Sequence, residues 1–251
     1  MALMPAETAL ARVLEGIGPP DEEIVPIGQA AGRVLARDLA ATLTQPPFNA
    51  SAMDGYAVYG ADAVSQGDRW TVVGEAAAGS AFAGNVGPGE AVRIFTGAPV
   101  PTACGTVVIQ ENVSRDADAL TANEPTQAGA NIRLAGNDFA QGDVLLSRGR
   151  RLDAYSATLA AAMGHGEVAV AHRPIVAILA TGDELVPPGI APGPDQIVSS
   201  NPVGLAALVT RAGGVPRDLG IAADRRDALA ERIAEARDAD ILVTIGGASV
   251  G

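Results

Sequence analysis

The sequence RPIVAILATGDELV, residues 173–186, decides the fold of the C-terminal part of the chain. Residues 175–180 form an unbroken apolar run, which is typical of a parallel strand covered by helices on both faces of its sheet. The run ends at Thr181-Gly-Asp-Glu, a polar sequence with a glycine that is typical of a turn. Residues 173–186 therefore predict the first strand of an α/β sheet and a polar loop at its carboxyl end.

Helix and strand patterns alternate downstream of this strand. Asn201 is the expected N-cap of the next helix, because the proline that follows it would occupy the favoured first helical position. The expected elements are a helix over residues 202–212, a strand over 215–221, a helix over 227–236 and a strand over 241–245. This order is half of a doubly wound parallel sheet. No crossover helix follows residues 246–251, so we expect the chain to be a truncated part of a longer protein.

Two kinds of sequence pattern occur upstream of residue 173. Short β-branched runs separated by Gly, Pro and Asn predict a small β domain, with strands near residues 70–73, 91–95 and 105–109. Apolar residues at helical spacing predict helices over residues 9–17, 27–39 and 153–164. We therefore expect a multidomain α/β plus β protein. Its parts are a helical linker domain at 1–45 and 139–172, an inserted β-rich domain at 46–138, and an incomplete doubly wound α/β domain at 173–251.

Composition argues against several classes of function. The 251 residues carry a net charge of −12 and all their cationic side chains are arginines, so no nucleic-acid partner is expected, because phosphate backbones require clustered Lys and Arg. No apolar run approaches the roughly 20 residues of a membrane helix, and the N-terminus lacks a secretion signal. Cys104 is the only cysteine, which excludes an internal disulfide and fits a reducing cytoplasm.

The loops at the carboxyl ends of the parallel strands are the candidate site, because ligands of such sheets bind there. Asp183 and Glu184 are adjacent carboxylates, and Mg²⁺ binds through one or two carboxylates together with phosphate oxygens and water. The glycine-rich residues 246–251 would let backbone N–H groups approach an anion, and the Ser249 hydroxyl could donate to a phosphate or a pterin. The plainer alternatives are a solvated acidic turn for the first loop and a simple glycine turn for the second.

Single residues elsewhere also have plain alternatives. Asp224 could be the N-cap of the helix that follows it, and Asp54, which precedes a glycine, is typical of a tight turn. His165 and His172 lack the spacing of metal ligands and are expected to be structural or exposed. Cys104 is expected to be a small buried residue rather than a nucleophile.

Taken together and in this order, the loop sequences resemble the MoeA family, which includes the E domain of gephyrin and whose members are molybdopterin molybdenumtransferases. The run SAMDGYA, residues 51–57, is highly specific for this family. The matching segments cover almost the whole chain and lie at residues 47–57, 93–101, 108–111, 131–133, 136–138, 181–185, 200–201 and 246–251. The resemblance is to the N-terminal portion of the family.

The resemblance implies a reaction in which molybdenum from molybdate is inserted at the dithiolene of adenylated molybdopterin, AMP is released and Mg²⁺ is required. It also implies a homodimer whose active site joins the α/β domain of one subunit to the β domain of the other, and a molybdopterin adenylyltransferase as a further partner. The residues that the motifs carry over as catalytic are Glu184, Asp54, Asp138 and Thr96. The substrate-binding residues carried over are Asp183, Asp224, Ser200, Asn201, Gly246, Gly247, Ser249 and Gly251, and the metal ligands are Asp54, Asp138, Glu184 and Asp224.

The sequence departs from the family pattern in three places. Asn49-Ala50 stands where the family has Asp-Asn, and Gly136-Asn-Asp stands where it has Gly-Glu-Asp. The acidic residue expected just past Gly251 and the family's C-terminal part are absent. Two alternatives therefore stay open: the adenylyltransferase that makes the adenylated pterin, which shares the last domain type, and a non-catalytic pterin-binding scaffold.

Overall fold

The computed structural model describes residues 4–60 and 62–246, and its contacts divide the chain into two compact units. Unit 1 comprises Met1–Arg37, Ser147–Ala157 and Glu167–Gly251. Unit 2 comprises Asp38–Leu146 and Thr158–Gly166. Each unit is therefore assembled from segments that are separated in the sequence.

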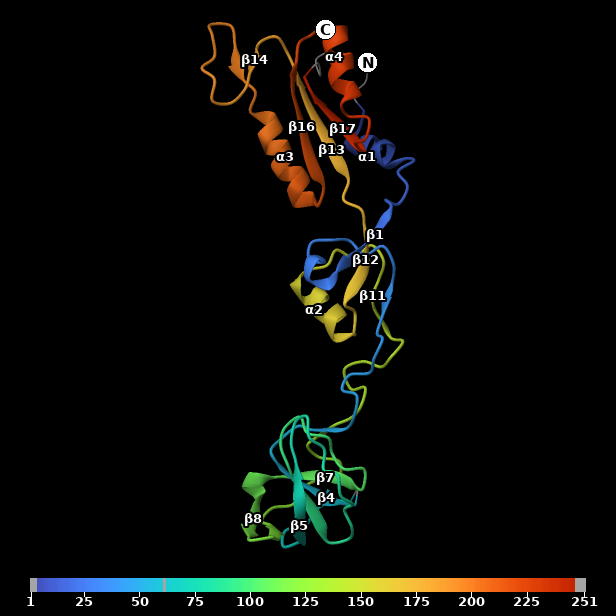
Figure 1. Ribbon diagram of the computed structural model, residues 1–251, viewed down its shortest axis with the longest axis vertical. Helices are drawn as coiled ribbons and strands as arrows, with labels where there is room; N and C mark the ends of the chain where they lie inside the picture. The colour runs from blue at the N-terminus through green and yellow to red at the C-terminus, as the bar shows by residue number, and fades with distance from the viewer. Residues whose placement is uncertain (1–3, 61, 247–251) are drawn as a thin grey trace. The chain divides into compact units, whose positions relative to one another are not determined.

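A parallel sheet of three strands, among the described residues, forms the C-terminal part of unit 1 (Figure 1). β13 (Ile175–Thr181) is the central strand, with β16 (Val215–Ala222) on one side and β17 (Ile241–Ile245) on the other. α3 (Asn201–Ala212) connects β13 to β16, and α4 (Arg226–Ala234) connects β16 to β17. The order of the elements and their parallel pairing confirm the predicted half of a doubly wound sheet.

β13 is buried on both faces of this sheet. Ile178 and Leu179, which point to opposite faces, are both fully buried. Leu179 belongs to a core cluster against which Leu229 of α4 packs, while α3 packs along β13 and β16. A strand covered by helices on both sides needs apolar side chains at every position, which is why its sequence does not alternate.

α3 begins one residue earlier than predicted and ends at the predicted glycine. The prediction that Asn201 is the N-cap is wrong by one residue, because Ser200 occupies that position and Asn201 is already helical. The Ser200 side chain makes no capping hydrogen bond. The helix ends at Gly213, whose φ of 103° lies in the left-handed region that glycine adopts without strain.

The remainder of unit 1 pairs the start of the chain with the segment that precedes β13. α1 (Ala6–Leu14) confirms the first predicted helix. β1 (Glu22–Pro26) follows it and pairs antiparallel with β12 (Glu167–Ala171). Arg33, which is 8% exposed, forms an ion pair with Glu23 of β1 and donates to the carbonyl of Ala171.

The helix predicted over residues 27–39 is wrong. Only a short 3-10 turn, η1 (Ile27–Gln29), forms there. Gly32 then reverses the chain with a φ of 81°, and the next residues make bridges from Val34 to Arg151 and from Leu35 to Val170. Glycines lower helix stability by about 1 kcal/mol each, so pairing with distant segments outweighs the helical spacing of the apolar residues.

Unit 2 contains a six-stranded sheet, among the described residues, in the order β7-β4-β6-β5-β9-β8 (Figure 1). Its strands are β4 (Gly55–Tyr59), β5 (Arg69–Ala76), β6 (Glu90–Ile94), β7 (Cys104–Ile109), β8 (Val113–Asp116) and β9 (Ala119–Ala122). Tyr56 and Val58 belong to one core cluster and Ala57 to another, so successive residues of β4 are buried on opposite faces. The curled sheet thus has core on both sides, and the predicted small β domain is confirmed.

Shorter elements complete the description. They are β2 (Leu39–Ala40) paired with β11 (Val144–Leu146), β3 (Ala50–Ser51) with β10 (Ile132–Arg133), β14 (Leu185–Val186) with β15 (Ile197–Val198), the 3-10 turn η2 (Gln110–Asn112), and α2 (Ala154–Ala162). α2 confirms the helix predicted near residues 153–164. No helix in the described part of the chain combines the length and apolarity needed to cross a membrane.

Gly55 begins β4 at a position where no side chain fits. A Cβ atom there would lie 2.1 Å from the carbonyl oxygen of Val108. The obstacle is backbone of β7, the strand with which β4 pairs, so relief would require the two strands to separate. Gly55 thereby allows the close approach of β4 and β7 and fixes where the preceding Asp54 lies.

We expect Gly55→Ala to lower the free energy of unfolding by about 1–3 kcal/mol, the usual cost of overpacking. The measurement is denaturant unfolding followed by circular dichroism. Gly87→Ala is the matched control, because a Cβ there meets only the Glu90 carboxylate at ordinary contact distances. Equal stability of the two variants would contradict the role assigned to Gly55.

Candidate functional site

Asp54 and Thr96 are brought together in unit 2. One carboxylate oxygen of Asp54, Oδ1, accepts hydrogen bonds from both the backbone N–H and the hydroxyl of Thr96, each at 2.8 Å. These two bonds, with a smaller contribution from the charge of Arg93, lower the pKa of Asp54 below its ordinary value. Asp54 is therefore a fixed, ionised carboxylate at the start of β4.

Arg93 anchors the turn that carries Asp54. Its guanidinium lies 5.0 Å from the centroid of the Tyr56 ring and 4.7 Å from that of Phe95. It donates to the carbonyl of Gly55 at 3.1 Å and to the side-chain oxygen of Gln110 at 2.7 Å. Stacking on two aromatic faces restricts the guanidinium plane, so Arg93 positions the residues that follow Asp54. The sequence motif contained Arg93, but only the cross-strand contact reveals this role.

Asp138 is paired with an arginine. Both of its carboxylate oxygens accept hydrogen bonds from Arg133, at 2.7 and 2.9 Å. Arg133 lies in β10, which pairs with β3 just before the Asp54 turn. The sequence placed Arg133 five residues before Asp138 but gave no sign that the two would meet. The negative charge of Asp138 is thus already balanced within unit 2.

Asp183 and Asp224 meet at the carboxyl ends of β13 and β16 in unit 1. The backbone N–H of Asp224 donates to Oδ1 of Asp183 at 3.1 Å. The suggestion that Asp224 caps the following helix is wrong, because α4 begins at Arg226 and its N-cap is Arg225, with no side-chain hydrogen bond. Asp224 belongs instead to the loop cluster beyond the strand ends, with its carboxylate exposed.

Glu184 folds back over its own loop. A Cβ added to Gly182 would lie 2.4 Å from Oε2 of Glu184, which places this carboxylate directly above the glycine. Glu184 is exposed, and its backbone carbonyl accepts a hydrogen bond from Ile197 at 2.8 Å. Gly182 is thus the residue that allows the Glu184 side chain to reach back towards the end of β13.

The residue that follows β17 touches the last residue of β13. A Cβ at Gly246 would lie 2.4 Å from the hydroxyl oxygen of Thr181. Gly246, with a φ of 128°, therefore allows the chain after β17 to lie close against the carboxyl end of β13. Of the other residues expected to bind substrate, Ser200 and Asn201 are exposed at the start of α3. Gly247, Ser249 and Gly251 lie outside the described residues.

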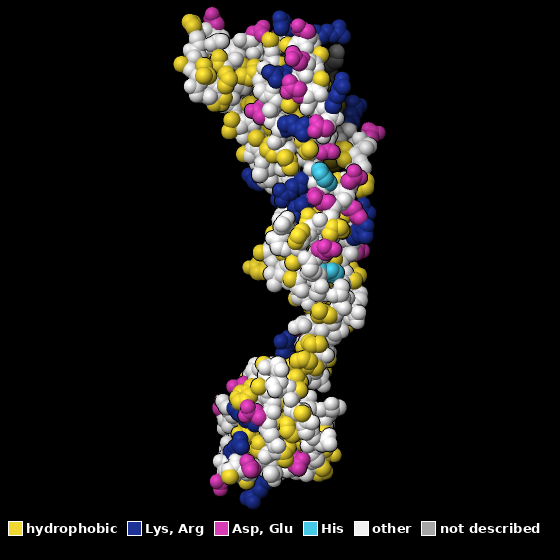
Figure 2. Space-filling view, viewed as in Figure 1, with side chains coloured by type: hydrophobic (Ala, Val, Ile, Leu, Met, Phe, Trp, Pro, Cys, Tyr) yellow, Lys and Arg dark blue, Asp and Glu magenta, His cyan; other side chains and the backbone are white. Residues whose placement is uncertain are grey.

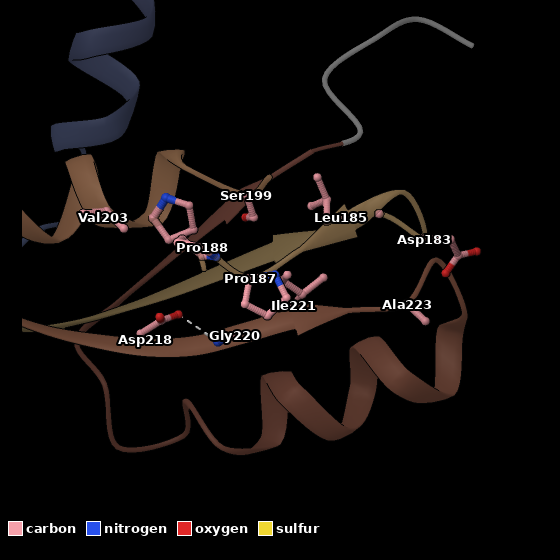
Figure 3. Close-up of a pocket in the computed structure, with 12 residues that line it drawn as sticks. Asp183, Leu185, Pro187, Pro188, Ser199, Val203, Asp218, Gly220, Ile221 and Ala223 are labelled. Carbon is pink, nitrogen blue, oxygen red and sulfur yellow. Dashed lines mark hydrogen bonds between the residues drawn. The ribbon is translucent and has the colours of Figure 1, made fainter. Parts of the chain in front are cut away.

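A cavity of about 450 Å³ opens beside this loop cluster, between the β14–β15 segment and β16 (Figure 3). Its size falls within the roughly 300–1,000 Å³ of small-molecule sites. Asp183 lies at one end of the cavity in the view of Figure 3 and Asp218 at the other, with Pro187 and Ile221 between them. Sequence reasoning missed Asp218, because an aspartate inside a strand pattern carries no signal for a ligand site.

No three His, Cys, Asp or Glu side chains of residues 4–60 and 62–246 converge as in a metal site built from protein alone. Mg²⁺ does not need such a cage, because it usually keeps several waters and takes one or two carboxylates together with substrate phosphates. The exposed carboxylates of Asp183, Glu184 and Asp224 are hard oxygen donors of the type that Mg²⁺ prefers. This loop cluster therefore fits Mg²⁺ that arrives with a phosphate-bearing substrate.

The histidines and the cysteine lie outside these clusters. The Nε2 atom of His165 lies 2.8 Å from the carbonyl oxygen of Ala40, a structural contact within unit 2. Cys104 is a free, buried thiol in β7. Burial raises the pKa of Cys104 to about 11, so the thiol is protonated at neutral pH and is a poor nucleophile.

Two family models match the chain. The one described as the MoeA N-terminal region (domain I and II) matches residues 4–164. The one described as a probable molybdopterin binding domain matches residues 177–251. Together these matches include both carboxylate clusters.

Curated relatives and solved structures give the same result. A molybdopterin molybdenumtransferase of Nostoc is 40% identical over 92% of this chain and 54% of the relative, and one of Haemophilus influenzae is 34% identical over 99% of this chain and 62% of the relative. The crystal structure of the molybdopterin biosynthesis moeA protein of Pyrococcus horikoshii superposes with a TM-score of 0.89 at 32% identity, over 98% of this chain and 67% of that one. The chain thus spans about half to three fifths of the length of these curated relatives.

We expect Thr96→Val to raise the pKa of Asp54, because the hydroxyl donor is lost while the backbone donor stays. The pKa is measured by carboxyl ¹³C NMR titration, with Thr102→Val, an exposed threonine nearby in the sequence, as control. Since the folded-state pKa is lowered, the stabilisation from Asp54 is present above its unfolded-state pKa and is lost as the pH falls through the folded value. An unshifted Asp54 pKa in Thr96→Val would refute this role of the hydroxyl.

Proposed function

Because the chain belongs to the MoeA family, we propose that it takes part in inserting molybdenum from molybdate into adenylated molybdopterin, with release of AMP. The single observation that carries the proposal is the joining of Asp183 to Asp224 beside Glu184 at the carboxyl ends of the parallel strands. This edge is where α/β sheets bind their ligands. The names of the relatives give the substrate class.

Mg²⁺ would be held by one or two carboxylates of the loop cluster that contains Asp183, Glu184 and Asp224, with water and phosphate oxygens as its other ligands. It would screen the charge of the substrate's pyrophosphate, as bound cations do in phosphoryl chemistry. The protein is acidic, with a net charge of −12, so carboxylates alone would repel such a substrate. Glu184 would orient the phosphates through the bound cation, and the position of its side chain over the Gly182 turn supports this role. The role of the three carboxylates is thus to position charge rather than to attack the substrate.

Asp54 would act from the β domain as a fixed, ionised group. The Thr96 hydroxyl donates its only proton to Asp54, so in this arrangement it cannot also donate to molybdate, whose oxygens are acceptors. Thr96 therefore positions Asp54. Asp138 contributes through Arg133, with which it is paired, and the guanidinium is the better group for contact with an oxyanion.

A homodimer is part of the proposal. α1 exposes its apolar side chains, with Leu10, Val13, Leu14 and Ile17 just beyond it each 59–67% exposed. A stripe of this kind is costly in water and is typical of a contact surface. A second copy of the chain is the partner that a symmetric site shared between subunits requires, and a molybdopterin adenylyltransferase would supply the substrate.

The proposed setting is the cytoplasm, which suits the free thiol of Cys104.

The first test is AMP release. The chain is incubated with adenylated molybdopterin, molybdate and Mg²⁺. We expect Glu184→Gln to reduce AMP release by about a hundredfold, because the cation that stabilises developing charge on the phosphates would be held less well. Glu231→Gln on α4, an exposed carboxylate away from the cluster, is the control. Undiminished AMP release by Glu184→Gln would refute the assignment, and adenylylation of molybdopterin from ATP would favour the adenylyltransferase instead.

The second test is complementation between subunits. Asp54→Asn and Glu184→Gln lie in different units, so a mixed dimer would contain one site free of both substitutions if each site takes its two clusters from different subunits. We expect the mixture to regain AMP release that neither variant shows alone. Activity that stays at the level of the separate variants, with mixed dimers verified by affinity tags, would contradict a shared site.

A further inference from the structure

A second hollow in unit 1 lies at the opposite edge of the parallel sheet from the strand-end carboxylates. It has a volume of about 170 Å³. Pro174, just before β13, and Gly213, just before β16, both line it, so it lies at the amino ends of these strands. Ligands of parallel sheets ordinarily bind at the carboxyl ends. The hollow is therefore separate from the site proposed for the reaction.

The charged side chains that line this hollow are cationic. They are Arg33 and Arg173, with His172 beside them, and none of the described residues in the lining is acidic. The cavity of Figure 3 is the opposite case, because its charged residues are Asp183 and Asp218. The whole chain carries 29 acidic and 17 basic residues, so a lining without a carboxylate is unusual for this protein. Its potential favours an anion.

Arg33 is buried, yet part of its guanidinium is available to a ligand. The side chain is 8% exposed. Its Nη2 atom donates to Glu23 and, at 2.8 Å, to the carbonyl of Ala171, whereas Nε and Nη1 make no hydrogen bond among the described residues. No side-chain nitrogen that is fully shut off from solvent lacks a partner in that part of the chain. The N–H groups of Nε and Nη1 are therefore accessible, and Arg33 lines the hollow.

Glu23 offsets only part of the positive charge. The hydrogen bond from Arg33 lowers the pKa of Glu23, and the charges of Arg33, His172 and Arg173 act in the same direction. The three cationic or ionisable groups thus lie near one ionised carboxylate, which itself is not in the lining. One negative charge between two guanidinium groups leaves the hollow positive.

The C-terminal end of α3 also reaches the hollow, through Ala212 and Gly213. Helix C-termini carry partial negative charge on their unpaired carbonyls and would repel an anion. Arg151 offsets this effect, because it donates to the carbonyl of Arg211 at 3.0 Å and to that of Gly32 at 3.3 Å. Figure 2 shows Arg side chains gathered on unit 1 between the parallel sheet and the β1–β12 pair.

We propose that this hollow binds a tetrahedral dianion of the size of phosphate or molybdate. Its volume lies below the roughly 300–1,000 Å³ of sites for larger organic ligands, so a nucleotide is too large, whereas an inorganic oxyanion fits with a few waters. Guanidinium groups suit such oxygens, and His172 adds a ring N–H donor. The site does not depend on the proposed reaction, since it shares no residue with either carboxylate cluster.

A bound dianion would join segments of unit 1 that are distant in sequence. The lining comes from the turn at residues 32–34, from residues 171–174 at the end of β12, and from the end of α3. A ligand that binds only the folded state stabilises that state by mass action. Phosphate should therefore raise the Tm of the chain as well as bind to it.

The test uses the 251-residue chain without Mg²⁺, so that the strand-end carboxylates repel the anion. Phosphate binding is measured by isothermal titration calorimetry at constant ionic strength, with chloride as the monovalent comparison. We expect saturable binding of phosphate and a rise of Tm, and neither effect with chloride. Molybdate is then added in competition. Displacement of phosphate at lower molybdate concentrations would assign the site to molybdate, and weaker or absent competition would assign it to phosphate; both results support a dianion site.

Variants locate the binding. Arg173→Gln removes an exposed cation, which leaves the core intact, and is expected to weaken phosphate binding about tenfold, the usual effect of losing a hydrogen bond between charged groups. Arg33→Lys keeps the charge that faces Glu23 but loses the other guanidinium donors, so it should also weaken phosphate binding. Arg69→Gln, at an exposed arginine of unit 2, makes the same change in net charge and is the control.

Four results would each overturn the proposal. They are the absence of saturable phosphate binding, equal binding of chloride, an unchanged phosphate affinity in Arg173→Gln, and an equal loss of affinity in Arg69→Gln. The last result would mean that net charge alone sets the affinity.

Discussion

The burial of β13 on both faces is the constraint on which unit 1 depends. Because Ile178 and Leu179 are fully buried on opposite sides, helices must cover both faces of the sheet, and the chain must cross from β16 back over β13 to reach β17. That reversal sends two loops to the same sheet edge, where Gly246 and Thr181 come into contact. Because the helices cover both faces of β13, polar residues begin only at its carboxyl end. The carboxylates of the candidate site lie there.

The β domain obeys a different constraint, which is the approach of two backbones. Gly55 has no room for a side chain against Val108, and this close pairing fixes the turn on which Asp54 stands. Thr96 and Arg93 then hold the turn from the neighbouring strand and its loop. The two carboxylate clusters are thus positioned in unlike ways, one by strand ends in a parallel sheet and one by a clamped turn in an antiparallel pair. The first collects several carboxylates, whereas the second presents a single one.

The sequence predicted those parts of the fold that rest on local pattern. Local sequence determines the structure of three segments: the apolar run at residues 175–180, the glycine after α3 and the β-branched runs of unit 2. The segment after β1 was predicted wrongly because its helical spacing was outweighed by bridges to Arg151 and Val170, which are distant in sequence. In the site, the resemblance identified Asp54, Thr96 and Asp138, but not that Thr96 bonds to Asp54 or that Arg133 pairs with Asp138. The pairings with Thr96 and Arg133 are set by strand register, which spacing along the chain does not encode.

Cys104 has a practical consequence. As the only cysteine in the chain, buried in β7 and with a pKa raised to about 11, it stays protonated at neutral pH. An exposed cysteine introduced elsewhere would have a pKa near 8.5 and would be far more reactive with maleimide or methanethiosulfonate reagents. Single-site spin labels and fluorophores can therefore be attached to either unit without first replacing the native thiol, so that motion of the Asp54 turn or of the β14–β15 segment becomes directly observable in the unaltered core.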